Sequence, residues 1–231
     1  ALGPFAAQAA VPQPHTPPSF SKTYAVYRMN YNESNDRGAG GIAGTAFFIS
    51  PNKAVTANHV LNKSGFKPLA GFDYVKVWLV HEGEPAIELS PEDVTSDAEV
   101  DRTIIITRIK VAEKYVYDSV PSSEVGSKVG SEGFVGDTLG PPTWHRGKEL
   151  KIVALPRLMR VRLEGNLTAD APVHLTTGVV QLKAACIQLN FGPIVGISGG
   201  PVTYQGKVIG MNSFGDPASR TTWAVKLPKN I

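Results

Sequence analysis

Short apolar runs separated by turn residues occupy most of the chain from Lys22 onward. They lie at 22–31, 42–50, 53–57, 73–80, 86–89 and 103–109 in the first half, and at 128–134, 150–155, 158–163, 173–182, 184–189, 201–204, 207–211 and 221–227 in the second. Runs of this length, bounded by Gly, Pro, Asn and Ser, are typical of β-strands. Helical periodicity is scarce, and the best helix candidate is Thr56–Leu61. The pattern therefore predicts an all-β protein.

The predicted strands fall into two successive sets, and the segment at 111–124 between them has the turn signal Pro121-Ser122-Ser123. Two sets of about six short strands indicate a sandwich or a pair of barrels. We expect a first unit at 22–115 and a second at 116–231. They follow a Pro- and Ala-rich segment at 1–21, which is expected to be extended.

Composition narrows the class of protein. The 231 residues are 42% hydrophobic, which is enough for a core in one domain or in two small barrels. The net charge of +3 is too small to single out nucleic acid as a partner. No apolar run reaches the roughly 20 residues that a membrane span needs. Cys186 is the single cysteine, so no intrachain disulfide is possible, and its apolar surroundings predict a buried structural thiol.

Three residues suggest chemistry. His59 lies in Thr56-Ala57-Asn58-His59-Val60, Asp101 directly precedes a strand-like run, and Ser198 lies in Gly196-Ile197-Ser198-Gly199-Gly200-Pro201. A serine hydroxyl is a weak nucleophile until a base such as imidazole takes its proton, and a carboxylate holds the imidazole in the required tautomer. The order His, Asp, Ser on an all-β chain therefore predicts a serine hydrolase, in the first place a peptidase.

The acidic member of this set has a rival. Five acidic residues fall between Glu92 and Asp101. Asp101 is favoured because the end of a strand can carry a carboxylate into a partly buried site, and Asp97 is the main alternative. The glycines around Ser198 permit a tight turn that exposes backbone N–H groups. We expect the N–H groups of Gly196 and Ser198 to bind the oxyanion.

Two other chemistries fit poorly. A glycine-flanked serine also occurs in α/β-hydrolases, but that fold needs a histidine after the serine, and none of the five histidines follows Ser198. No two histidines have the spacing of metal ligands, and none pairs with Cys186. No metal and no cofactor are predicted.

Three segments, at 44–50, 54–60 and 196–201, resemble the chymotrypsin/trypsin-like serine peptidase superfamily, and the resemblance extends from about Lys22 to Pro228. Within this superfamily, the chain resembles the disulfide-free branches, such as the HtrA-type peptidases, the glutamyl endopeptidases and the viral processing peptidases. The resemblance implies two six-stranded antiparallel β-barrels with the active site in the cleft between them. Ile197 stands where digestive members carry an Asp that pairs with a freed N-terminus, so no such activation switch is implied.

The resemblance also implies where a peptide substrate binds. The segment at 208–215 matches the substrate-binding strand, with the peptide extended along Ser213 to Gly215. Gly192 is implied near the base of the primary pocket, with Gly215 and Thr221 at its walls and Phe214 adding apolar surface. Glycine at 215 leaves room for a medium or large side chain, and the absence of an acidic residue disfavours a basic one.

Two other functions stay open. One is a catalytically silent, protease-like module that binds a peptide or a protein. The other is a polyprotein-processing serine protease of viral type. The sequence leaves open a secreted or periplasmic location and release from a larger polyprotein, and it leaves the oligomeric state undetermined.

Overall fold

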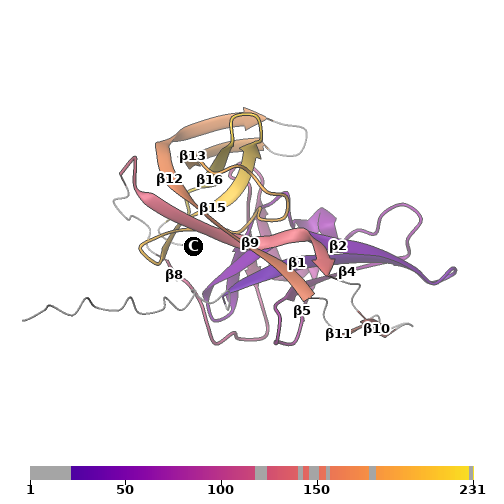
Figure 1. The fold of residues 1–231 in the computed structure, drawn as a ribbon. Helices are drawn as coiled ribbons and strands as arrows, with labels where there is room; N and C mark the ends of the chain where they lie inside the picture. The colour runs from indigo at the N-terminus through magenta and orange to yellow at the C-terminus, as the bar shows by residue number, and fades with distance from the viewer. Residues whose placement is uncertain are drawn as a thin grey trace, which may run out of the picture.

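The computed structural model describes residues 22–117, 124–139, 143–145, 151–154, 157–176, 181–228 and 231. Within these ranges the protein is all-β, with two large sheets, one small hairpin and two short 3₁₀ helices (Figure 1). None of the described helices is long and apolar enough to cross a membrane. The segments 1–21 and 121–123, expected to be extended or loose, lie outside the described residues.

The first sheet has the strand order β5-β4-β1-β2-β3-β7-β6. Its strands are β1 (Thr23–Asn32), β2 (Arg37–Ser50), β3 (Lys53–Thr56), β4 (Tyr74–Val80), β5 (Ile87–Leu89), β6 (Val94–Asp97) and β7 (Arg102–Ile106). The helix η1 (Lys63–Phe66) follows β3, and η2 (Pro91–Asp93) joins β5 to β6. The two outermost strands are thus consecutive in the chain, so the sheet rolls into a barrel in which β5 and β6 act as one interrupted strand.

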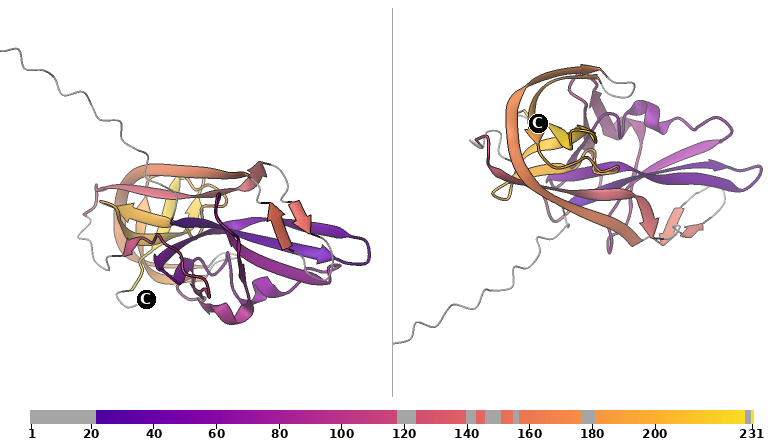
Figure 2. Two further views of the ribbon diagram at one scale, coloured as in Figure 1. Left: turned by 90° about the horizontal axis from the view of Figure 1, so that it is seen from below. Right: turned by 45° about the horizontal axis from the view of Figure 1, so that its top comes forward.

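The second sheet closes on itself by hydrogen bonding. It consists of β8 (Val116–Tyr117), β9 (Lys128–Leu139), β12 (Arg157–Thr176), β13 (Gln181–Leu189), β14 (Pro201–Tyr204), β15 (Lys207–Asp216) and β16 (Thr221–Val225). Pairing of β14 with both β9 and β15 completes a six-stranded ring, to which β8 adds in parallel (Figure 2). A separate hairpin pairs β10 (Thr143–His145) with β11 (Lys151–Ala154). The predicted two-barrel, all-β fold is confirmed.

Strand β1 connects the two barrels because both of its faces are buried. Tyr24 and Val26 belong to the core of the first barrel. The alternate residues Ala25 and Tyr27 pack in a second cluster that includes Phe134 of β9. Side chains alternate between the faces of a strand, so a strand apolar on both faces can lie between two cores. In Figure 1, β9 accordingly runs across β1 and β2.

Three local predictions differ from the structure. Residues 56–61 form no helix, only one turn closed by Leu61 N–H to Ala57 C=O (3.1 Å), and the Asn58 N–H at its start bonds to the Asp101 carbonyl. The predicted run at 158–163 and the start of the run at 173–182 belong to the single strand β12, which pairs first with β9 and then with β13, whereas residues 181 and 182 begin β13. Strand β6 was not predicted, because its only buried apolar side chain is Val94.

Candidate active site

His59 and Asp101 lie in two turns that the first barrel places side by side. His59 follows β3, Asp101 precedes β7, and these strands pair at Thr56 and Thr103. Oδ2 of Asp101 lies 2.9 Å from His59 Nδ1, and Oδ1 accepts the His59 backbone N–H at 2.9 Å. A carboxylate only accepts, so Nδ1 carries the proton and Nε2 presents a lone pair. That is the state a general base needs.

The Asp101 carboxylate is buried, with 1% of the residue exposed. Its second support comes from the other barrel, because the Ser213 hydroxyl on β15 donates to Oδ2. The backbone φ of Asp101 is +46°, a left-handed conformation that Asp adopts more readily than most residues. The His59 side chain keeps 19% of its surface exposed. The arrangement is a buried, hydrogen-bonded carboxylate behind an accessible imidazole.

Asp97, the alternative acid, lies elsewhere. Its side chain is 47% exposed and pairs with Arg102 at 3.5 Å. Of the two acids considered, Asp101 is the one that contacts His59. Arg102, the residue that follows Asp101, directs its guanidinium to Asp97 in this ion pair.

Ser198 lies in the loop 190–200 that joins β13 to β14, and three backbone hydrogen bonds hold its surroundings. Gly199 N–H donates to Asn212 C=O at 2.8 Å, and Asn212 N–H donates to Gly200 C=O at 2.9 Å. The Ser198 carbonyl accepts the Thr45 N–H at 2.8 Å. The loop is thereby attached to β15 of its own barrel and to β2 of the other.

Gly199 lets this loop approach the His59 turn. Its φ is +81°, and an added Cβ would lie 2.1 Å from the Thr45 carbonyl oxygen and 2.3 Å from Thr56 Oγ1. A side chain is therefore excluded on both conformational and steric grounds. Because Thr56 ends the strand that leads to His59, this close contact brings Ser198 to the same junction between the barrels.

The reactive groups of the loop are not engaged by the described part of the protein. Ser198 Oγ has no hydrogen-bond partner among the described residues, and in particular it forms no hydrogen bond with His59 Nε2. The N–H groups of Gly196 and Ser198 likewise have no acceptor among the described residues. Gly196 has a φ of +101°, which again requires glycine. N–H groups that the fold leaves unused are available to an anionic oxygen.

The predicted substrate-binding residues lie near one another. The structure adds two neighbours that the sequence did not indicate, Pro193 beside Gly215 and Arg220 beside Gly192. A Cβ at Gly215 would lie 2.4 Å from Pro193 Cβ, so the Pro193 ring fills the side-chain position of Gly215. A Cβ on Gly192 would have Arg220 Cβ as its nearest neighbour, at 4.0 Å, and Thr221 C=O also borders Gly215. Phe214 stacks on Trp223 at 4.6 Å.

Other candidate groups do not form a competing site. Burial raises the pKa of the Cys186 thiol to about 12, and the negative charge of Asp101 contributes to that rise, so the thiol stays protonated at neutral pH. His81 is buried with its ring 5.2 Å from the Tyr24 ring, and His174 is exposed. Among the described residues, His, Cys, Asp and Glu side chains form no cluster suited to a metal ion.

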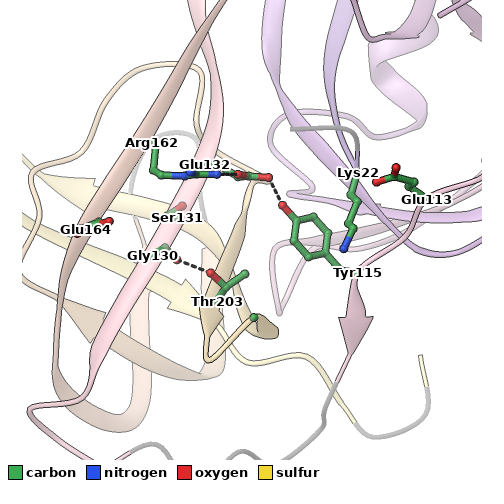
Figure 3. A pocket seen from close by; sticks show the side chains of 10 residues that line it. Lys22, Glu113, Tyr115, Gly130, Ser131, Glu132, Arg162, Glu164 and Thr203 are labelled. Atoms are coloured by element: carbon green, nitrogen blue, oxygen red, sulfur yellow. Dashed lines mark hydrogen bonds and ion pairs between the residues drawn. The ribbon is translucent and has the colours of Figure 1, made fainter. Parts of the chain in front are cut away.

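A second buried carboxylate, not predicted from the sequence, joins the barrels at Glu132 of β9. Its oxygens accept from the Thr23 hydroxyl at 2.7 Å, from the Tyr115 hydroxyl and from Arg162 at 3.0 Å. Glu132, Tyr115 and Arg162 border a cavity of about 550 Å³ between the barrels, where Lys22 lies over the Tyr115 ring (Figure 3). The partners Thr23, Tyr115 and Arg162 offer Glu132 hydroxyls and a permanent cation, and none of these partners is an imidazole.

The contacts of the Ser213 and Thr45 side chains were not predicted from the sequence. Ser213 was expected to contact substrate, but its hydroxyl lies against Asp101, which leaves its backbone for that role. Thr45 was part of a matching segment without a role of its own, yet it contacts the Ser198 loop. Both interactions join residues more than 100 positions apart (|i−j| of 112 and 151). No local signal in the sequence indicates such contacts.

No protein-family model and no curated protein sequence matches the chain. Solved structures do. The active form of the Rv3671c protease from M. tuberculosis is 17% identical, with a TM-score of 0.60 over 98% of this chain and 89% of that one. Deg5 is 16% identical, with a TM-score of 0.53 over 87% of this chain and 83% of its own. The HtrA-type protease AlgW with a tripeptide is 16% identical, with a TM-score of 0.56 over 89% of this chain and 56% of its own. The chain therefore has the trypsin-like serine protease fold.

Proposed function

We propose that the protein is a serine endopeptidase that works through an acyl-enzyme intermediate. Ser198 Oγ attacks the peptide carbonyl while His59 Nε2 takes its proton, and the resulting imidazolium passes that proton to the leaving amine. Water then repeats the sequence and releases the acyl group. Asp101 fixes the tautomer of His59 and stabilises the imidazolium. The observation that carries the proposal is the bond between His59 Nδ1 and a buried Asp101, next to the loop of Ser198.

The oxyanion is assigned to the N–H groups of Gly196 and Ser198. Both are unused among the described residues, and both belong to the loop that carries the nucleophile. Backbone donors held in place stabilise the negative charge that develops on the carbonyl oxygen. Ser198 Oγ and His59 Nε2 form no hydrogen bond in this structure, and this is compatible with the scheme because catalytic hydrogen bonds are often long in free enzymes and shorten when substrate binds.

The substrate is an extended peptide that pairs with β15 at Ser213 to Gly215. An added strand gains backbone hydrogen bonds, and pockets for alternate side chains supply selectivity. Because the Pro193 ring fills the space at Gly215, we assign the primary pocket to a small uncharged side chain rather than a medium or large one. Cleavage of a mixed peptide library tests this assignment, and frequent cleavage after Phe or Tyr would contradict it.

A fluorophosphonate probe tests the proposal directly. Wild-type protein is expected to be labelled, and both Ser198→Ala and His59→Ala are expected to lose labelling while their circular dichroism spectra stay unchanged. Labelling that persists in Ser198→Ala would reject the assignment of the nucleophile. A folded wild type that resists labelling, yet binds extended peptides, would establish the catalytically silent module instead.

A further inference from the structure

Thr45 of the first barrel forms two hydrogen bonds with the Ser198 loop. It is fully buried in β2, and each of its polar groups has a partner. Its N–H donates to Ser198 C=O at 2.8 Å, and its C=O accepts the Thr56 hydroxyl at 2.7 Å. Its hydroxyl donates to Gly196 C=O at 2.8 Å and accepts the Phe134 N–H at 3.0 Å.

The direction of the hydroxyl bond is fixed by its two neighbours. The Phe134 N–H can only donate, so the Thr45 oxygen accepts there and its own proton goes to Gly196 C=O. Thr45 thus holds the carbonyls of Gly196 and Ser198, the two that flank the peptide unit bearing the Ser198 N–H. That N–H is one of the two assigned oxyanion donors. Fixing both flanking carbonyls limits rotation of the peptide between them.

A further close contact shows how tightly this arrangement is packed. An added Cβ at Gly133 would lie 2.7 Å from Thr45 Oγ1 and 3.1 Å from Ile197 Cα. Gly133 therefore allows β9, Thr45 and the loop to meet at van der Waals distance. The hydroxyl is enclosed by β2, β9 and the loop itself, which leaves little room for a replacement donor.

We propose that the Thr45 hydroxyl is a positioning group that keeps the Ser198 loop in the conformation in which its N–H groups bind the oxyanion. This inference rests on the proposed peptidase function. Without the hydroxyl, the buried Gly196 C=O would lose its one hydrogen-bond donor among the described residues, a situation that proteins avoid. The loop is therefore expected to move until Gly196 C=O finds another donor.

Thr45→Val tests the inference, because it keeps the branched shape and removes the hydroxyl. We expect kcat to fall about 10²-fold with KM nearly unchanged, since the loss concerns the transition state. Thr45→Ser restores the hydroxyl and is expected to stay within about threefold of wild type. The control is Thr107→Val, a buried threonine at the end of β7 whose hydroxyl donates to Ile109 C=O at 2.6 Å. It is expected to lower Tm without changing kcat.

The outcomes separate this inference from the proposed function. Wild-type kcat in Thr45→Val, with a fall in Tm like that of Thr107→Val, would reduce Thr45 to a structural role and leave the peptidase assignment intact. If Thr45→Val does not fold, Thr45→Cys takes its place, because a thiol is a weak donor and acceptor. Should wild type itself fail to react with the probe, hydrogen exchange of residues 194–200 still tests the hydroxyl. Faster exchange in Thr45→Val than in Thr45→Ser would support the role, and equal exchange would refute it.

Discussion

Two buried carboxylates join the barrels, and they differ in what lies against them. Asp101 faces an imidazole, whereas Glu132 faces Arg162 and the hydroxyls of Thr23 and Tyr115. Both are nearly inaccessible to solvent, at 1% and 7% exposed, and both receive hydrogen bonds from the two barrels. The guanidinium stays charged at all relevant pH values, while imidazole gains and loses a proton near neutrality. In the proposed mechanism, the imidazole partner rather than burial of the acid distinguishes the Asp101 junction from the Glu132 junction.

The two junctions are also physically continuous. Glu132 and Phe134 are two residues apart on β9, and an added Cβ at Gly200 would lie 2.4 Å from the Glu132 carbonyl oxygen. The strand whose side chain holds the barrels together therefore has its backbone against the loop of Ser198. The comparison predicts that changes at Asp101 affect chemistry and that changes at Glu132 affect stability.

Removing the charge of Asp101 is expected to have the largest effect. Asp101→Asn keeps the size of the side chain but loses the acceptor that fixes His59, and kcat is expected to fall about 10⁴-fold. Asp97→Asn, in the same turn region but exposed, is the matched control and is expected to stay within about twofold. Steady-state hydrolysis of a peptide ester measures both. A fall confined to Asp97→Asn would transfer the role to that residue.

Glu132→Gln is expected to change stability instead. It removes the charged acceptor shared by Arg162 and the Thr23 and Tyr115 hydroxyls. Hydrogen bonds to charged groups contribute about 1.5–3 kcal/mol, so we expect a loss of about 2–4 kcal/mol. For a chain of this size that corresponds to a fall in Tm on the order of 10 °C, measured by thermal unfolding. Glu164→Gln, which removes an exposed ion pair with Lys128, is the control and should be nearly neutral. Probe reactivity well below the melting range should remain near wild type, and its loss would show that the Glu132 junction also controls the loop.

Ser213→Ala is expected to have an intermediate effect on catalysis. It removes one hydroxyl donor from the Asp101 carboxylate and leaves the His59 bond in place. A hydrogen bond to a charged group contributes about 1.5–3 kcal/mol, so kcat is expected to fall by about one to two orders of magnitude. Peptide ester hydrolysis with Ser213→Thr as the rescue variant measures this. An unchanged kcat would mean that His59 alone holds Asp101.

The smallest expected effect is a change in the pH dependence of stability on replacing Cys186, since the charge of Asp101 contributes to the raised pKa of its thiol. Its pKa is raised from 9.0 to about 12 in the folded protein, chiefly by burial. Below pH 9 both the folded and the unfolded thiol are protonated. Between pH 9 and pH 12 the unfolded chain releases the proton while the folded chain keeps it, so the free energy of unfolding falls as pH rises. Urea unfolding should show a weaker alkaline decline in Cys186→Ala than in wild type, and equal declines would contradict the buried thiol.

Much of the fold could be predicted from the sequence because strands have a local pattern of apolar residues. Alternating or continuous apolar runs marked most strands, and the positions of His59, Asp101 and Ser198 stood out through their neighbours. Strand β12 was divided in the prediction because its central residues are mostly exposed, and backbone pairing to β9 and β13 holds it together. The turn at 56–61 was predicted as a helix because its hydrogen bonds to Asp101, such as that of the His59 N–H 42 positions away, leave no local signal in the sequence.

The sequence determined the all-β class, the two successive sets of strands and the residue types available for chemistry, because these follow from periodicity and from motifs within a few residues. The two-barrel arrangement was implied by the family resemblance of those motifs. Folding in three dimensions decided which of Asp97 and Asp101 meets His59, which hydroxyl supports the acid and what fills the space beside Gly215. Those choices depend on contacts between β2, β9, β15 and the loops of opposite barrels. Hydrogen bonds and steric exclusion act over a few ångströms, and residues distant in the chain reach that range only when both barrels have formed.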